Sequence, residues 1–241
     1  MRILAYLGVV VLTLAVVAPT GRADDFTPEE GFVSLFNGKD LTGWFYKGSK
    51  EKLDGKTQTA DGRIVVEKGT IVMQEKDDNG KGGIRDLTTL KTYAKSFHLK
   101  LEFEASLKSD SGVYIRGPQL QVRDFIRRNE QKHLKKFIDD GWNTLDIIVR
   151  DNQVIAVVGG KLLGPKDKLT VSLDKGEATA TLNGKTIDAK TVQFKHGTVA
   201  ECLCNGEPLE VMLTIPAKGG IGLQAETGKF AFRRVRVKEL E

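Results

Sequence analysis

The most constraining feature of this sequence is a run of nine residues, 97–105, in which apolar and polar side chains alternate without a break. One parity holds Phe97, Leu99, Leu101, Phe103 and Ala105, and the other holds His98, Lys100, Glu102 and Glu104. Side chains of a β-strand point alternately to the two faces of a sheet, so this run predicts a half-buried strand. A sheet that is apolar on one face must bury that face against another layer.

A second strand signal follows at residues 111–125, where two short alternating runs flank Gly117-Pro118. This dipeptide is a turn signal, so we expect an antiparallel hairpin. The apolar face of the hairpin would carry Val113, Ile115, Leu120 and Val122. The polar face would carry Tyr114, Arg116, Gln119, Gln121 and Arg123, with Asp124 at its end. A phenol, amides and a guanidinium on one surface indicate a ligand-binding site rather than a polar surface that only contacts solvent.

The rest of the chain repeats this pattern. Hairpin turns are expected at Lys68-Gly69 and Asn183-Gly184, and the change of parity within residues 230–240 predicts a β-bulge near Arg233-Arg234. Residues 126–140 break the strand pattern and predict a short surface helix or an ordered loop, which is either a solvated basic face or a lid. Roughly eleven to thirteen short strands with Gly-rich turns predict an all-β sandwich or jelly roll.

The N-terminus reads as a targeting segment. Residues 1–23 combine a positive start at Arg2, a long apolar run and a Gly21-Arg22-Ala23 cleavage site, which predicts a secretory signal peptide. An uncleaved membrane anchor is the alternative. We expect residues 24–241 to form one domain, secreted or periplasmic, with no membrane contact after cleavage because no other apolar run could span a bilayer.

Charge and cysteine content exclude several classes of protein. The formal charge of +5 falls to +3 on loss of Arg2 and Arg22, too weak a polarity to predict a nucleic-acid partner. Cys202 and Cys204 are the two cysteines, and their spacing permits a strained local disulfide or free thiols. No nucleophile elbow, phosphate loop, dinucleotide fingerprint or zinc-protease motif occurs, so no cofactor and no metal are expected.

The remaining candidate site is therefore a polar sheet face. Glu102 and Glu104 would join Tyr114, Gln119 and Gln121 if their strands were neighbours. Carboxylates and amides bind vicinal hydroxyls, while aromatic rings pack on the apolar faces of sugars, so this combination predicts a carbohydrate partner. The alternative for Glu102 and Glu104 is ordinary cross-strand pairing with Lys or Arg.

Five blocks of the sequence resemble the 3-keto-disaccharide hydrolase domain family, formerly a domain of unknown function. They are L-F-N-G-K-D-L-T-G-W at 35–44, S-G-V-Y-I-R-G at 111–117, Q-V-R-D at 121–124, W-N-T at 142–144, and G-I-G-L-Q with F-R-R-V-R-V at 220–237. The blocks run in the family's order over nearly all of residues 24–241. The resemblance implies a concanavalin A-like jelly-roll sandwich of two antiparallel sheets that binds sugar on a concave face.

The activity that the resemblance implies is the cleavage of glycosides already oxidised at C3. A C3 ketone acidifies the C2 proton, so a base can remove it and expel the C1 substituent, after which water adds back. By resemblance, Asp124 would be the base or its orienter and Arg116 the partner of the enolate or a hydroxyl, with Glu102 as a second candidate base. Gln121, Trp142, Asn143 and Gln224 match family positions and, with Gln119 and Tyr114, would bind substrate.

Four departures from the family pattern bear on catalysis. Gln119 stands where the family usually has Glu, and Ala225-Glu226 stands where a histidine is frequent. The loop after Asp124 is replaced by the basic stretch 126–140, and residues 153–182 resemble an insertion. The leading hypothesis is thus an exported enzyme acting on 3-keto-glycosides. The alternatives are a non-catalytic carbohydrate-binding or cell-envelope interaction module and a structural envelope protein.

Overall fold

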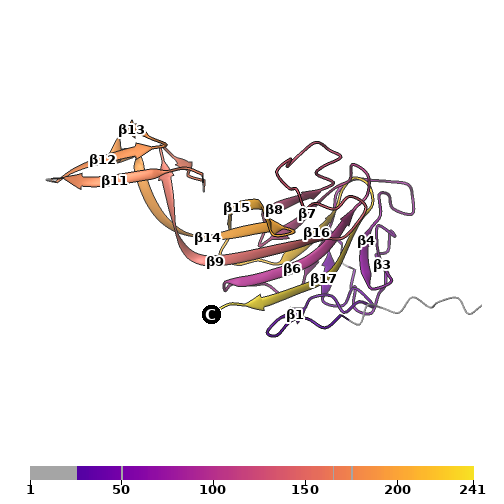
Figure 1. The fold of residues 1–241 in the computed structure, drawn as a ribbon. Coiled ribbons are helices and arrows are strands. Elements are labelled where there is room, and N and C mark those ends of the chain that lie inside the picture. The colour runs from indigo at the N-terminus through magenta and orange to yellow at the C-terminus, as the bar shows by residue number, and fades with distance from the viewer. Residues whose placement is uncertain (1–25, 50, 165, 175) are drawn as a thin grey trace, which may run out of the picture.

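The computed structural model describes residues 26–241 except positions 50, 165 and 175. The expected signal peptide at 1–23 lies outside the described residues. Two antiparallel sheets face each other, and a narrow arm of strands projects from one end of this body (Figure 1). The helical element among the described residues is a single short 3₁₀ turn, η1 (Ala189–Thr191).

The larger sheet runs through nine strands. Across the sheet they are β15 (Glu207–Ile215), β14 (Val192–Cys204), β9 (Asn143–Val158), β6 (Phe97–Ala105), β17 (Phe230–Glu239), β4 (Thr70–Met73) and β3 (Ile64–Glu67). Short β1 (Val33–Ser34) pairs with β17, and β10 (Lys161–Leu162) pairs with β9.

The smaller sheet of the body has five strands. Across it lie β2 (Trp44–Tyr46), β5 (Arg85–Thr89), β16 (Ile221–Ala225), β7 (Asp110–Ile115) and β8 (Gln119–Arg123). The inward faces of the two sheets form one apolar core. Leu99 and Phe103 of β6 and Val113 and Val122 of the hairpin are all fully buried in it. This architecture is a concanavalin A-like jelly roll, as the sequence predicted.

Several local predictions are confirmed. Strand β6 has the predicted bounds and a strict buried–intermediate alternation. The hairpins at Lys68-Gly69 and Asn183-Gly184 form β3–β4 and β12–β13 (β12 is Glu177–Leu182, β13 is Lys185–Ile187). The bulge also occurs: the register of β17 against β6 shifts between Arg233 and Arg236, and Arg234 has a φ of 52°.

Other predictions were incomplete or wrong. The described chain holds seventeen strands, and β2, β5 and the whole of β14 were not foreseen. Strand β9 runs unbroken through the turn-forming residues Asp151 and Asn152, with Asn152 at a φ of 55°. Residues 126–140 form turns rather than a helix, which bears out the ordered-loop alternative. Cys202 and Cys204 are free, buried thiols that face the core.

The arm consists of the distal half of β9, β10, the first half of β14 and a separate three-stranded sheet. In that sheet β11 (Leu169–Asp174) pairs with β12, and β12 with β13. Strands β9 and β14 stay paired outward from the body, from Gly197↔Gln153 to Val192↔Val158. The arm ends at the β11–β12 hairpin (Figure 1).

Candidate functional site

Four of the predicted substrate-binding residues meet on the outward face of the smaller sheet. Tyr114 of β7 lies opposite Gln119 of β8, and Gly222 of β16 completes the row. Gln121 and Gln224 occupy the same face, since each lies two residues from a member of that row or its strand. The hairpin prediction therefore placed Tyr114, Gln119 and Gln121 together correctly, and the structure adds Gln224 to the same face.

A chain of hydrogen bonds connects three of these side chains. Gln119 Nε2 donates to Gln224 Oε1 at 2.6 Å, and Gln224 Nε2 donates to the Tyr114 hydroxyl at 2.6 Å. Gln119 reaches Gln224 by lying across Gly112 of β7, where an added Cβ would be 2.1 Å from Gln119 Nε2. The absence of a side chain at Gly112 thus makes this link possible.

Tyr114 is a protonated hydroxyl at neutral pH. Burial, reinforced by the charge of Asp86, raises the pKa of Tyr114 to about 12. Asp86 of β5 accepts from Lys47 Nζ at 3.1 Å, and the Lys47 ammonium also lies 5.4 Å from the centroid of the Tyr114 ring. Gln224 donates to the Tyr114 oxygen, and a hydrogen bond to Asp86 adds to the raised pKa, so the Tyr114 proton is directed toward the Asp86 carboxylate.

A second group on this face centres on Asp110 at the start of β7. Its Oδ1 accepts from Gln121 Nε2 at 2.6 Å and from Arg123 Nε at 2.8 Å, and its Oδ2 lies 3.4 Å from Arg128 Nη2. Glu226 follows β16 with the same parity as Gln224. Burial and the nearby charge of Asp110 raise the pKa of Glu226 above its usual 4.5. A carboxyl with a raised pKa at a polar surface is a candidate acid–base group.

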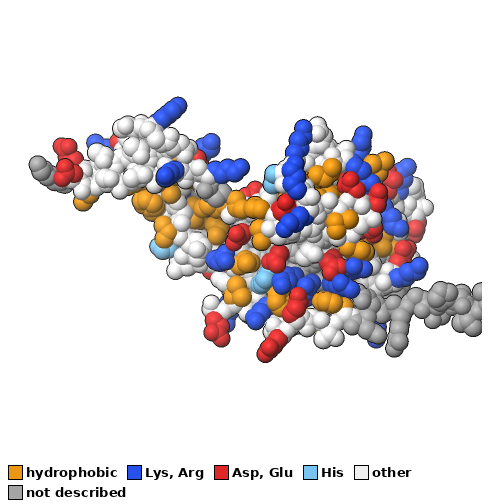
Figure 2. Space-filling view, viewed as in Figure 1, with side chains coloured by type: hydrophobic (Ala, Val, Ile, Leu, Met, Phe, Trp, Pro, Cys, Tyr) orange, Lys and Arg blue, Asp and Glu red, His pale blue; other side chains and the backbone are white. Residues whose placement is uncertain are grey.

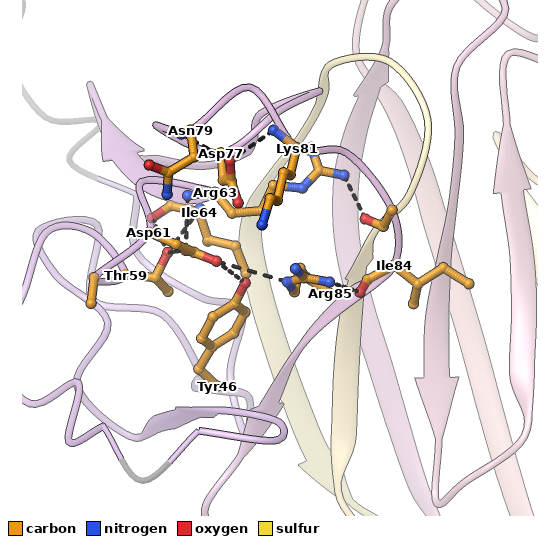
Figure 3. Close-up of polar contacts among 12 residues, drawn as sticks. Tyr46, Thr59, Asp61, Arg63, Ile64, Asp77, Asn79, Lys81, Ile84 and Arg85 are labelled. Carbon is orange, nitrogen blue, oxygen red and sulfur yellow. Dashed lines mark hydrogen bonds and ion pairs between the residues drawn. The ribbon is translucent and has the colours of Figure 1, made fainter.

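A buried guanidinium supports the backbone under Glu226. Arg63 Nη2 donates to the carbonyl oxygens of Gly83 at 2.8 Å and Glu226 at 2.9 Å. Beside it, Tyr46 and Arg85 both point at the Asp61 carboxylate, with Tyr46 Oη at 2.7 Å and Arg85 Nε at 3.8 Å (Figure 3). Arg63 thus fixes the strand end that carries Glu226.

The prediction that Arg116 lies on the polar face of the hairpin was wrong. Arg116 has a φ of 55°, which breaks the strand alternation, and its side chain is fully buried. Nη1 pairs with Asp151 Oδ1 at 2.7 Å, and Nη2 donates to the Lys95 carbonyl at 2.5 Å. Asp151 lies on β9, so Arg116 links the two sheets instead of facing solvent.

Asp124 is placed just after β8 but turns away from the polar face. Its carboxylate is fully buried, accepts from the Lys108 N–H at 2.6 Å and pairs with Arg127 Nε at 2.7 Å. Arg127 also pairs with Asp140, so Asp124 anchors the loop that follows the hairpin. Both contacts are made by Oδ2, and Oδ1 is buried without a hydrogen-bond partner among the described residues, so Asp124 fixes the loop and is closed off from solvent.

Glu102 and Trp142 lie on the outward face of the other, larger sheet. Our expectation that Glu102 shares a surface with the hairpin was wrong, because β6 and β7 belong to different sheets. Glu102 pairs with Arg233 at 2.7 Å and with Arg234 at 3.0 Å, and Arg233 stacks 4.0 Å from the Trp142 ring. This is the cross-strand pairing that the sequence left open as the alternative.

Asn143 is fully buried at the start of β9. Its side chain accepts from the Ile138 N–H and from Asn205 Nδ2 and donates to the Ile138 and Gly141 carbonyls. All of the amide's capacity is used within the protein. Asn143 therefore shapes the loop before β9.

The site residues that sequence reasoning missed are Lys47, Asp86, Asp110 and Glu226. Asp86 was missed because β5 was not recognised: R-D-L-T-T is short, and of the three positions with core-facing parity, Arg85, Leu87 and Thr89, Leu87 alone is apolar. Glu226 was noted only as a departure from a histidine. Within the described residues, no group of three or more His, Cys, Asp or Glu is arranged to hold a metal, and no helix is long and apolar enough to cross a membrane.

Two facing antiparallel sheets with an outward polar face define a jelly roll of the concanavalin A-like class. A family model described as a 3-keto-alpha-glucoside-1,2-lyase-like domain matches residues 31–238, and the chain belongs to this family. Membership supports a carbohydrate-related role.

The solved structures to which the chain is similar are distant. A candidate glycosyl hydrolase from Parabacteroides distasonis ATCC 8503 is 17% identical, with a TM-score of 0.42 over 88% of this chain and 95% of that one. A carbohydrate-binding module from Bacillus subtilis is 10% identical, with a TM-score of 0.34 over 82% of this chain and 96% of that one. No curated protein sequence gives a significant match.

Proposed function

We propose that the outward face of the five-stranded sheet binds a glycoside and that a 3-keto-glycoside is cleaved there by elimination across C1 and C2. The observation that carries the proposal is the gathering of Tyr114, Gln119, Gln121, Gln224 and Glu226 on one surface of a chain in this family. The proposal includes export to the periplasm or the medium, which rests on the apolar segment at residues 1–23.

The reaction needs few protein groups. A base takes the C2 proton, and the electrons of the C2–H bond form an enolate with the C3 oxygen. When the enolate reverts to the ketone, the C1–O bond breaks, and the leaving oxygen takes a proton from the protonated base or from water and departs as an alcohol. Water addition to the resulting enone would complete net hydrolysis. The enzyme must supply the base, a hydrogen-bond donor for the enolate oxygen and polar groups that hold the sugar hydroxyls.

Glu226 is the base that this geometry supports best. Its raised pKa brings it closer to the operating pH than an ordinary carboxyl. Tyr114 is the donor for the enolate oxygen, because its hydroxyl remains protonated and can turn its proton from Asp86 to the substrate. Gln119 and Gln121 bind hydroxyls. Asp124, the base suggested by resemblance, is replaced in this scheme because its carboxylate is buried against Arg127.

A second candidate function is carbohydrate binding without cleavage. The observation that favours it is the closed chain from Gln119 through Gln224 to Tyr114, in which an amide stands where the family usually has a carboxylate. Amides and a phenol can form hydrogen bonds with one another and with sugar hydroxyls, but they are not bases that could remove a proton from C2.

One experiment separates the two functions. The purified chain is incubated with a 3-keto-glucoside and with the unoxidised glucoside, and release of the aglycone is followed over time. The enzyme proposal expects turnover of the 3-keto substrate alone, and it expects Glu226→Gln to lose turnover while binding the sugar. Glu201→Gln, at an exposed Arg150 pair on the other sheet, is the matched control. Sugar binding without turnover by the unaltered chain would leave the binding module as the function.

A further inference from the structure

The arm exposes an apolar surface that the rest of the described chain leaves uncovered. On the paired part of β9 and β14, Val154 and Phe194 lie on one face and are 62% and 61% exposed. Ile155 and Val157, on the opposite face, are buried. One side of this ribbon is thus packed and the other is open, although both are apolar.

These exposed side chains form a continuous surface. Val154, Phe194 and Val171 of β11 line a groove of about 380 Å³ that reaches Met212 of β15 on the body. Leu173 has the same parity as Val171 and, at 76%, is the most exposed large apolar side chain in the described chain. Val154, Val171, Leu173, Phe194 and Met212 are called the apolar stripe below. Hydrophobic side chains gather along the lower edge of the arm and at its junction with the body (Figure 2).

The two ends of the apolar stripe differ in charge. At the tip, Asp174 and Glu177 are exposed and form no ion pair with other described residues, with Lys175 between them in the sequence. Near the body end, the exposed loop lysines Lys132, Lys135 and Lys136 also lack a described ion-pair partner.

The lysine loop is held against the strand at which the apolar stripe ends. His133 Nε2 lies 2.7 Å from the Pro208 carbonyl, and the Lys136 N–H donates to Glu207 at 2.7 Å. Pro208 precedes Met212 by four residues on β15, a distance of roughly 13 Å along a strand. Glu207 and Glu210, the acidic side chains there, are engaged by the N–H groups of Lys136 and Met212.

We propose that the arm docks onto a second copy of this chain as a two-fold dimer. The tip of each arm inserts Leu173 beside Met212 of the other copy, and Asp174 and Glu177 approach the other copy's lysine loop. A two-fold axis makes each contact occur twice, so one self-complementary surface accounts for both the exposed tip and the open groove. An apolar patch of this kind on a soluble chain marks an interaction surface.

The chemistry of the apolar stripe favours this occupant over a glycan. Sugar recognition needs convergent amides, carboxylates or aromatic faces, and the groove offers mainly aliphatic side chains and one Phe ring. The acidic arm tip would pair best with a basic surface, and the lysine loop would pair best with an acidic one. A second copy of this chain supplies both.

Sedimentation equilibrium of the purified chain over a range of concentrations tests the proposal. We expect a dimer that Leu173→Asp weakens by about tenfold or more, because a buried Leu becomes a charge. Leu107→Asp, at a side chain that is 66% exposed on the turn after β6, is the matched control and should leave the dimer intact. Replacing Asp174 and Glu177 together by Lys should also weaken the dimer and reverse its salt dependence, because added salt would then screen a repulsion between like charges.

A cross-link locates the contact. A chain carrying both Leu173→Cys and Met212→Cys should form a disulfide-linked dimer on mild oxidation, whereas Leu107→Cys should not. A chain that stays monomeric at about 100 µM, or a dimer unaffected by Leu173→Asp, overturns the proposal. So does a monomer that instead sediments with anionic lipid vesicles, which would assign the apolar stripe to a membrane surface. None of these outcomes depends on the sugar assay.

Discussion

Gln119 crosses strand β7 above Gly112 to donate a 2.6 Å hydrogen bond to Gln224, although their strands, β8 and β16, are not neighbours. The bond joins two residues 105 positions apart in the sequence. The surface offered to a ligand is therefore set by a glycine as much as by the amides themselves.

Gly112→Ala should loosen this surface without unfolding the protein. The new Cβ would displace the Gln119 amide, a flexible group, so we expect a stability change within about 1 kcal/mol. Loss of the Gln119–Gln224 bond should weaken sugar affinity by about two- to tenfold. Calorimetric titration with the glycoside measures the effect. Gly82→Ala, where an added Cβ meets only ordinary contacts, is the control, and equal affinity in both variants would contradict the assignment.

Arg116→Ala should destabilise the fold. The variant leaves Asp151 without its buried guanidinium, and we expect the free energy of unfolding to fall by about 2–4 kcal/mol. This is toward the low end of what breaking a buried ion pair costs, because Asp151 is partly exposed. Urea unfolding followed by tryptophan fluorescence measures it. Arg150→Ala removes an exposed pair with Glu201 and should cost no more than about 1 kcal/mol. Similar losses in both variants would refute the linking role of Arg116.

The raised pKa of Glu226 predicts the acid limb of the pH–rate profile. The base works in its ionised form, so kcat/KM should fall as pH drops through a value above 4.5, the usual pKa of Glu. Asp110→Asn removes a charge that raises this pKa and frees Arg123 and Arg128 to lower it further, so the limb should move to lower pH. Glu201→Gln should leave it in place. An unmoved limb in Asp110→Asn would exclude Glu226 as the titrating group.

Acid should destabilise the protein partly through Glu29. Paired hydrogen bonds from Arg236 at 2.5 and 2.8 Å lower the pKa of Glu29 from 4.5 to about 2. The ionised form is favoured in the folded state, so this contribution is complete above pH 4.5 and is lost as the pH falls toward 2. Glu29→Gln should flatten the dependence of Tm on pH in that window. A curve parallel to that of the unaltered chain would show that the pair contributes nothing.

Both thiols should be inert in the native protein. Burial, followed by the charge of Glu207, raises the pKa of Cys204 to about 12, and burial likewise raises the pKa of Cys202. The thiolate is the reactive form, so a chromogenic disulfide reagent at pH 8 should label neither residue until denaturant is added. Rapid labelling of the native chain would contradict their core placement.

What the sequence determined by itself was local. Strict alternation specified β6 to the residue, Gly-containing turns specified the hairpins, and a change of parity located the bulge at Arg234. Alternation also placed Tyr114, Gln119 and Gln121 on one surface, because the two faces of a strand follow from its backbone geometry alone.

Only the tertiary structure decided which surface each strand presents and which partner each charge finds. Glu102 lies on a different surface from the hairpin because β6 belongs to the larger sheet. Asp124 is buried next to Arg127 of the following loop, with which it forms an ion pair. Arg116 is buried in an ion pair with Asp151 of β9. Gln119 donates a hydrogen bond to Gln224 across the intervening strand β7. These outcomes depend on contacts between segments far apart in the chain, and the period of a single strand carries no information about them.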